Sequence, residues 1–162
     1  MKQAMLLPLG LMLASCATIT PKFTTNPPSV GWTQVVAVAP TSGPEAQQPL
    51  YTLRHQTTGA VVEVDAYKFD GQPAAEIGRL IRDKLTYAGF VCTALIIDGE
   101  TANFRIVFTD KYGAHWRGKI AVRRVIGAPQ TSIYVFTGHW SAGAEMQIVP
   151  EFDAIVASAA VK

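Results

Sequence analysis

The two cysteines, Cys16 and Cys92, are the most nucleophilic side chain type in this 162-residue sequence. Cys16 directly follows Leu13-Ala14-Ser15, whereas Cys92 lies inside the apolar segment 90–97. A cysteine reacts as its thiolate, which neighbouring His, Lys or Arg side chains favour. No such residue adjoins Cys92 in the sequence, so we expect Cys92 to be a buried, small apolar side chain. Cys16 is therefore the candidate for covalent chemistry.

The residues ahead of Cys16 predict a targeting segment. Lys2 is the only charged residue before an apolar stretch that runs from Ala4 to Leu13. This stretch is too short to cross a bilayer core, which takes roughly 20 helical residues. A short apolar run behind a positive charge is typical of a signal peptide. We therefore expect residues 1–15 to be a signal peptide that is absent from the mature domain.

The motif Leu13-Ala14-Ser15-Cys16 resembles the lipobox of bacterial lipoproteins. In that family the cysteine sulfur carries a diacylglyceryl group, the chain is cut before the cysteine, and the new N-terminus usually receives an acyl chain such as palmitate. The resemblance implies lipidation of Cys16, and two or more acyl chains hold a protein stably at a membrane surface. The alternative is a buried N-terminal helix with an ordinary thiol, which Pro8 and Gly10 disfavour.

The residue after Cys16 bears on the membrane in question. In Gram-negative lipoproteins an aspartate at this position usually retains the protein in the inner membrane, and this sequence has Ala17. The resemblance therefore implies an outer-membrane lipoprotein on the periplasmic face, with the inner membrane as the less favoured location. Lipidation also leaves Cys92 without a partner for an intrachain disulfide in the mature chain.

A serine motif in the C-terminal part of the chain provides a weak case for hydrolysis. The segment 139–143, His-Trp-Ser-Ala-Gly, resembles the G-x-S-x-G turn of α/β-hydrolases. His139 stands where that motif needs a glycine to form the sharp turn that exposes the serine. We therefore expect a strand that ends in a turn of small residues, and no catalytic serine.

Carboxylates and histidines do not form a recognisable catalytic or metal motif. Glu63 and Asp65 would share one face of a strand, and paired carboxylates divide acid and base roles only where their environments separate the two pKa values. We expect them on a solvated face, opposite Val62 and Val64. The histidines lack short metal-ligand spacing, which leaves open a site assembled in space: His55, His115 and His139. We expect no enzyme activity, no cofactor and no metal.

Four basic side chains form a candidate binding face. Three of them alternate with apolar residues along one expected strand and so project from a single face, and the fourth lies on the preceding strand. Such a face would bind anionic lipid, lipopolysaccharide phosphates or an acidic protein. The alternative is the ordinary polar face of an antiparallel sheet, neutralised by acids on neighbouring strands. The four residues are Arg105, Arg117, Lys119 and Arg123.

The overall charge excludes one class of partner. The sequence has 14 Lys+Arg against 12 Asp+Glu, for a formal net charge of +2. This balance gives no broad basic surface for nucleic acid. We therefore expect the partners to be the membrane, through the lipid anchor, and a protein in an envelope complex.

The elements that position these residues follow from composition and periodicity. Residues 16–31 are rich in Thr and Pro, which predicts a lipidated N-terminus and an extended tether, and residues 32–162 are expected to form a single periplasmic α+β domain. Two helices are expected, one from Pro73 to a stop at Gly89 and one over 150–160. The expected strands are 34–39, 50–56, 60–69, 90–97, 102–109, 116–125 and 132–140.

The order of these elements predicts the fold class. Hairpin-connected strands, a helix, more hairpin-connected strands and a closing helix are typical of an α+β two-layer sandwich. In this arrangement the sheet is mostly antiparallel and both helices pack on one of its faces.

The segment from Phe69 to Pro73, with the helix and its exit through 87–91, is similar to small envelope-assembly lipoproteins. These include the lipopolysaccharide-assembly lipoprotein and TrbH, the small lipoprotein of conjugal-transfer gene sets. The resemblance implies a non-enzymatic structural or assembly subunit of an envelope complex, in secretion, conjugal transfer or outer-membrane and lipopolysaccharide assembly. The alternatives are a lipoprotein that binds lipid or another small ligand and, less favoured, an envelope hydrolase.

Overall fold

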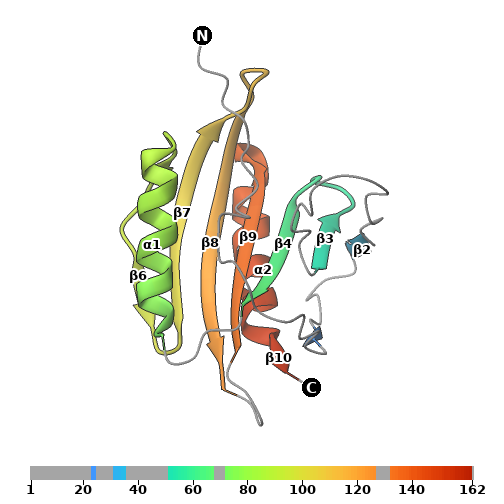
Figure 1. The fold of residues 1–162 in the computed structure, drawn as a ribbon. Coiled ribbons are helices and arrows are strands. Elements are labelled where there is room, and N and C mark those ends of the chain that lie inside the picture. The colour runs from blue at the N-terminus through green and yellow to red at the C-terminus, as the bar shows by residue number, and fades with distance from the viewer. Residues whose placement is uncertain (1–22, 25–30, 36–50, 68–71, 127–131, 162) are drawn as a thin grey trace, which may run out of the picture.

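The computed structural model describes residues 23–24, 31–35, 51–67, 72–126 and 132–161. Eight strands form one antiparallel sheet in the order β2-β3-β4-β9-β8-β7-β5, and β6 also pairs with β7 (Figure 1). A separate two-stranded sheet joins β1 (Phe23–Thr24) to β10 (Ala160–Val161). The strands of the large sheet are β2 (Trp32–Val35), β3 (Tyr51–His55), β4 (Val61–Tyr67), β5 (Val91–Cys92), β6 (Ile96–Asp98), β7 (Thr101–Thr109), β8 (His115–Val125) and β9 (Ser132–Ser141).

Most of the predicted strands are confirmed, and one of them is divided. The prediction over 90–97 becomes β5 and β6, because the backbone N–H of Arg105 on β7 donates to the Thr93 hydroxyl at 2.9 Å. This side-chain bond replaces a rung of the ladder and separates the two short strands. The strand expected over 34–39 begins earlier, at Trp32, and residues 36–39 lie outside the described part of the chain.

The helix α1 (Ala74–Tyr87) agrees with the prediction at both ends. It starts directly after Pro73, and its buried residues include Ile77, Ile81 and Leu85, which repeat at intervals of four. The φ of Gly89 is 96°, a conformation that only glycine adopts without strain. The Phe90 N–H then donates to the Leu85 carbonyl at 3.0 Å, which closes the last turn.

The helix α2 (Glu145–Ser158) starts earlier than predicted and contains Pro150 in its interior. The expectation placed Pro150 in the first turn, because proline has no N–H to donate inside a helix. In the structure a 3-10 turn over Ala142–Ala144 precedes α2, and Ile148, ahead of the proline, is fully buried. Burial of this first part of the helix outweighs the hydrogen bond that proline cannot form.

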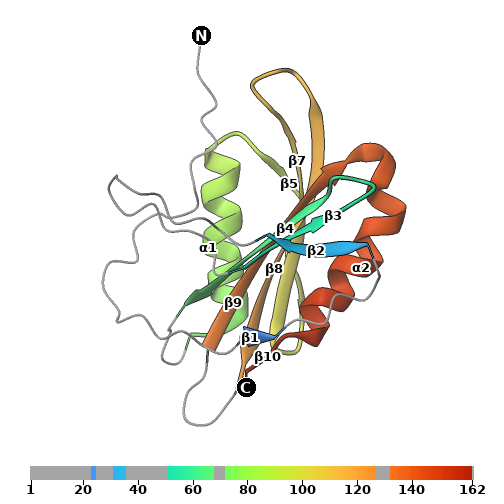
Figure 2. The same cartoon turned by 90° about the vertical axis from the view of Figure 1, so that its right-hand side faces the viewer.

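The α+β class and the antiparallel sheet are confirmed, but the helices lie on opposite faces of the sheet instead of on one (Figure 2). Neighbouring residues of a strand point to opposite faces. Ile120 and Val122 of β8 pack in the cluster of α1, whereas Ala121 between them packs in the cluster of α2. The architecture is therefore helix, sheet, helix in three layers.

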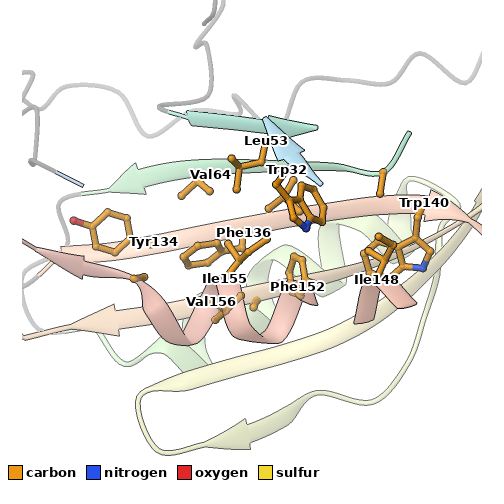
Figure 3. Close-up of a cluster of buried hydrophobic side chains, with 14 of the residues drawn as sticks. Trp32, Leu53, Val64, Tyr134, Phe136, Trp140, Ile148, Phe152, Ile155 and Val156 are labelled. Atoms are coloured by element: carbon orange, nitrogen blue, oxygen red, sulfur yellow. The ribbon is translucent and has the colours of Figure 1, made fainter. Parts of the chain in front are cut away.

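The burial of the central strand β9 explains why the helices cover both faces of the sheet. In β9 four consecutive residues, Ile133 to Phe136, are at most 1% exposed. A strand with apolar residues at every position is buried on both faces, whereas alternation is typical of burial on one face. The larger cluster lies under α2, where Phe152 and Ile155 face the sheet beside Phe136 (Figure 3).

The predicted tether also contains a strand. β1 lies within residues 16–31 and pairs with β10, with Phe23 opposite Val161 and Thr24 opposite Ala160. β1 therefore lies nearer to Cys16 in the sequence than Trp32, where the domain is expected to start. Neither α1 nor α2, the helices of the described part of the chain, is long and apolar enough to cross a membrane.

Candidate functional site

The four predicted basic residues lie on one face of the sheet. Arg105 of β7 is directly opposite Lys119 of β8, and Arg117 and Arg123 stand two and four residues from Lys119 on the same strand. Side chains at these positions share a face. It is the face that α2 covers, because Ala121 between Lys119 and Arg123 packs under that helix.

The helix α2 supplies acids to this basic face. Glu145 at its start accepts hydrogen bonds from Arg105, at 3.1 Å, and from Arg117. Asp153 accepts one from Lys119 at 2.6 Å. If the face were an ordinary polar sheet face, the neutralising acids were expected on neighbouring strands. In the structure they come from α2, about 30 residues after Arg117 and Lys119 in the sequence.

Arg123 completes the row at the other end of α2. Its guanidinium donates to the backbone carbonyl of Val156, in the last turn of the helix. The last carbonyls of a helix have no partner within the helix and carry partial negative charge. The basic row therefore follows α2 from its first residue to its last turn and fixes its direction over β8.

The charges at the start of α2 are not balanced. Two guanidinium groups, those of Arg105 and Arg117, share the single carboxylate of Glu145. Their side chains are 53% and 48% exposed, so donors remain open to solvent. Guanidinium groups bind carboxylates and phosphates with two parallel hydrogen bonds. This end of the basic face can therefore accept a further anion.

The opposite face of the sheet carries partly buried carboxylates beside α1. Asp65 lies directly opposite Val135, which belongs to the α1 cluster. Burial, with a smaller contribution from the charge of Glu63, raises the pKa of Asp65 from 3.8 to about 6, and burial also raises the pKa of Glu63. The prediction that these carboxylates are solvated is therefore wrong, because both are partly buried. Val62 points to the other face of the sheet, as expected, and is fully buried.

The remaining sequence candidates do not assemble into catalytic groups. Burial, together with the charge of Arg54, lowers the pKa of His139. The His139 ring packs edge-on against Trp116, with 5.7 Å between the ring centroids. Ser141 has ordinary extended backbone (φ −67°, ψ 152°), unlike the strained turn of a hydrolase serine. Within the described ranges no three His, Cys, Asp or Glu side chains are placed to hold a metal ion. Cys92 is half-buried and Cys16 lies outside the described residues.

A polar group that the sequence does not predict joins β2 to α2. The indole N–H of Trp32 donates to Glu151 at 2.7 Å, and His55 Nε2 lies 3.6 Å from the same carboxylate. Trp32 and His55 also contact edge-on at 5.1 Å. A Cβ on Gly31 would lie 2.6 Å from His55 Nε2, so a larger residue at this position would displace the buried His55 ring. Since 119 residues separate Trp32 from Glu151, no local pattern could have revealed the group.

Two solved structures are similar to the chain in fold. One is LpqN, described as involved in cell envelope biogenesis of Mycobacterium tuberculosis, with a TM-score of 0.62 and 8% identity over 88% of this chain and 84% of that one. The other is cyanobacterial PsbP (CyanoP) from Synechocystis, with a TM-score of 0.51 and 12% identity over 93% and 99% of the two chains. No protein-family model and no curated protein matches the sequence. At these identities the likeness shows the fold, and function rests on the chain's own residues.

Proposed function

We propose that this protein is a lipid-anchored envelope protein of the periplasmic face of the outer membrane. The observation that carries the proposal is the segment Leu13 to Cys16, placed directly after an apolar run too short to span a membrane. The folded domain that follows has the fold of a protein described as involved in cell envelope biogenesis, which supports an envelope role. Ala17 favours the outer membrane over the inner membrane.

Within the envelope the domain acts as a non-enzymatic structural or assembly subunit. Its basic face supports this role, because Glu145 holds the half-exposed side chains of Arg105 and Arg117 in fixed positions at the start of α2. Fixed charges on a rigid sheet orient a partner and add little to the stability of the domain, since exposed ion pairs contribute about 0–1 kcal/mol each. The partner is an acidic protein surface of a secretion, conjugation or outer-membrane assembly complex.

A second candidate function is binding of an anionic lipid or another small anion. The observation that favours it is the sharing of one carboxylate by Arg105 and Arg117, which leaves guanidinium donors for a phosphate group. The ligand class includes the phosphates of lipopolysaccharide.

The anchor is tested by replacing Cys16 with Ala in cells grown with labelled palmitate. The wild-type chain should carry the label and float with membranes, and Cys16→Ala should lose both properties, because the thiol is the site of acylation. Cys92→Ser is the matched control and should keep the label. Equal labelling of Cys16→Ala and wild type would refute the lipid anchor.

The partner class is tested at the open guanidinium groups. In vivo photo-crosslinking from position 105 or 117 should give one dominant protein adduct if the domain is an assembly subunit, and a lipid adduct if it binds anionic lipid. Position 79 on the exposed face of α1 is the control. Crosslinks no stronger than those from position 79 would argue against a binding role for the basic face.

A further inference from the structure

The pairing of β1 with β10 places the chain after Cys16 at one end of the domain. β1 follows Cys16 by six residues, and β10 follows the last turn of α2. Figures 1 and 2 both show this small sheet at the end of the molecule where α2 stops, away from the hairpin that joins β7 to β8. The segment that would carry the lipid is thus tied to the end of α2.

The contacts of α2 define the axis between the two ends. Glu145, its first residue, contacts Arg117 near the start of β8, and Val156 in its last turn contacts Arg123 near the end of β8. α2 therefore runs along β8 and away from the β7–β8 hairpin. β8 has 11 residues, which at about 3.4 Å per residue gives a length of roughly 35 Å.

The chain between Cys16 and β1 is short on this scale. The seven Cα steps from Cys16 to Phe23 span at most about 25 Å, since each extended residue covers roughly 3.3–3.6 Å. A lipid on Cys16 would therefore lie within about 25 Å of β1. The length of β8, roughly 35 Å, exceeds this reach, so the domain cannot stand upright on its hairpin end with the lipid in the same bilayer.

Exposed apolar side chains are present toward both ends of the domain, with Tyr87, Val91 and Met146 toward the hairpin end, so the short tether and not the apolar surface selects the end that the lipid would reach. Ile126 follows the end of β8 and is 69% exposed, and Ile96 and Ile97 of β6 are 60% and 52% exposed. β6 pairs with the first residues of β7, beside the last residues of β8. Exposed isoleucines are stabilised by transfer into the boundary between headgroups and acyl chains.

We propose that the β1–β10 end of the domain rests on the membrane that holds the lipid of Cys16, and that the β7–β8 hairpin points away from it. The isoleucines at positions 96, 97 and 126 contact the lipid surface, and Tyr112 at the hairpin, which is 82% exposed, faces the aqueous space. This orientation rests on the proposed lipid anchor. It turns the end of α2 with the two open guanidinium groups toward partners in the periplasm.

The orientation is tested with the full lipidated chain in phosphatidylglycerol and phosphatidylcholine vesicles. Ile126→Cys and Tyr112→Cys, each in a Cys92→Ser background, carry the same fluorophore, and nitroxide-labelled lipids quench it near the bilayer. Quenching should be several-fold stronger at position 126 than at position 112. The variant Phe23→Pro/Thr24→Pro, which removes the N–H donors of β1, should reduce this difference because it lengthens the free tether.

The outcomes separate the orientation from the anchor. Equal quenching at the two positions, or stronger quenching at position 112, in chains that float with the vesicles would overturn the orientation and leave the lipid anchor standing. A wild-type chain that carries no lipid and does not float would overturn the anchor and, with it, the orientation. An unchanged difference in the double proline variant would remove β1 as its cause.

Discussion

Replacement of Asp65 by Asn should stabilise the protein in a pH-dependent way. Asp65 stands on β4 beside the α1 cluster, and its pKa is raised from 3.8 to about 6, first by burial and second by the charge of Glu63. The amide has nearly the same shape as the carboxyl group and carries no charge at any pH. The substitution therefore removes the cost of a partly buried negative charge without opening a cavity.

The magnitude follows from the shift in pKa. The folded state binds the Asp65 proton more tightly than the unfolded state, so the free energy of unfolding falls as the pH rises from about 4 to about 6. A shift of about two units, at 1.36 kcal/mol per unit, corresponds to at most about 3 kcal/mol. Asp65→Asn should therefore be more stable than wild type by up to this amount above pH 6, and by little near pH 4.

Urea denaturation followed by tryptophan fluorescence measures this difference at pH 4 and pH 8. A change of about 3 kcal/mol is a large part of the 5–15 kcal/mol typical of a folded domain. Asp98→Asn, on an exposed position of β6, is the matched control and should change stability by less than about 0.5 kcal/mol at either pH. A variant at position 65 that is no more stable than wild type at pH 8, or that gains the same amount at both pH values, would refute the reasoning.

Three further substitutions, one of them with a matched control, test the contacts that hold the helices and β2. Trp32→Phe keeps an aromatic ring and loses the hydrogen bond donated by the indole, so thermal unfolding should show a loss of about 1–2 kcal/mol. Gly138→Ala should destabilise strongly, because its Cβ would lie 2.6 Å from a buried ring, whereas Gly143→Ala, with open space around its Cα, should be near neutral; equal effects would contradict this packing. Glu145→Gln should cost about 1 kcal/mol or less and raise the affinity of the protein for inorganic phosphate, because Arg105 and Arg117 lose their shared carboxylate, and unchanged affinity would argue against an open anion site.

The sequence predicted the elements that depend on local chemistry. α1 was predicted at both ends, because Pro73 and Gly89 act through their own backbone preferences and the apolar period of the helix lies within 14 residues. The hairpin between β3 and β4 was equally local, since Gly59 adopts a φ of 68° at its turn. The early start of α2 was not predicted, because it is stabilised by burial of Ile148 against the sheet. The sequence of the helix alone does not indicate this contact.

The candidate site shows the same division. Alternation along β8 was enough to place Arg117, Lys119 and Arg123 on one face, because the period of a strand is fixed at two residues. Nothing in that alternation identified Glu145 and Asp153 as their partners, since the pairing depends on which face α2 covers. The raised pKa of Asp65 could not be predicted from the sequence either, because it results from burial beside α1, which depends on the tertiary structure.

By itself, the sequence determined the α+β class, the antiparallel hairpins, the common face of the basic residues and the expectation of a lipid at Cys16, all of which depend on neighbours in the chain. Only the tertiary structure decided that the helices cover opposite faces, that α2 neutralises much of the basic row, and that β1 ties the N-terminal segment to the end of α2. These features depend on contacts between residues far apart in sequence. Local preferences favour the same helices and strands in several arrangements, and burial of apolar surface and pairing of charges decide which arrangement has the lowest free energy.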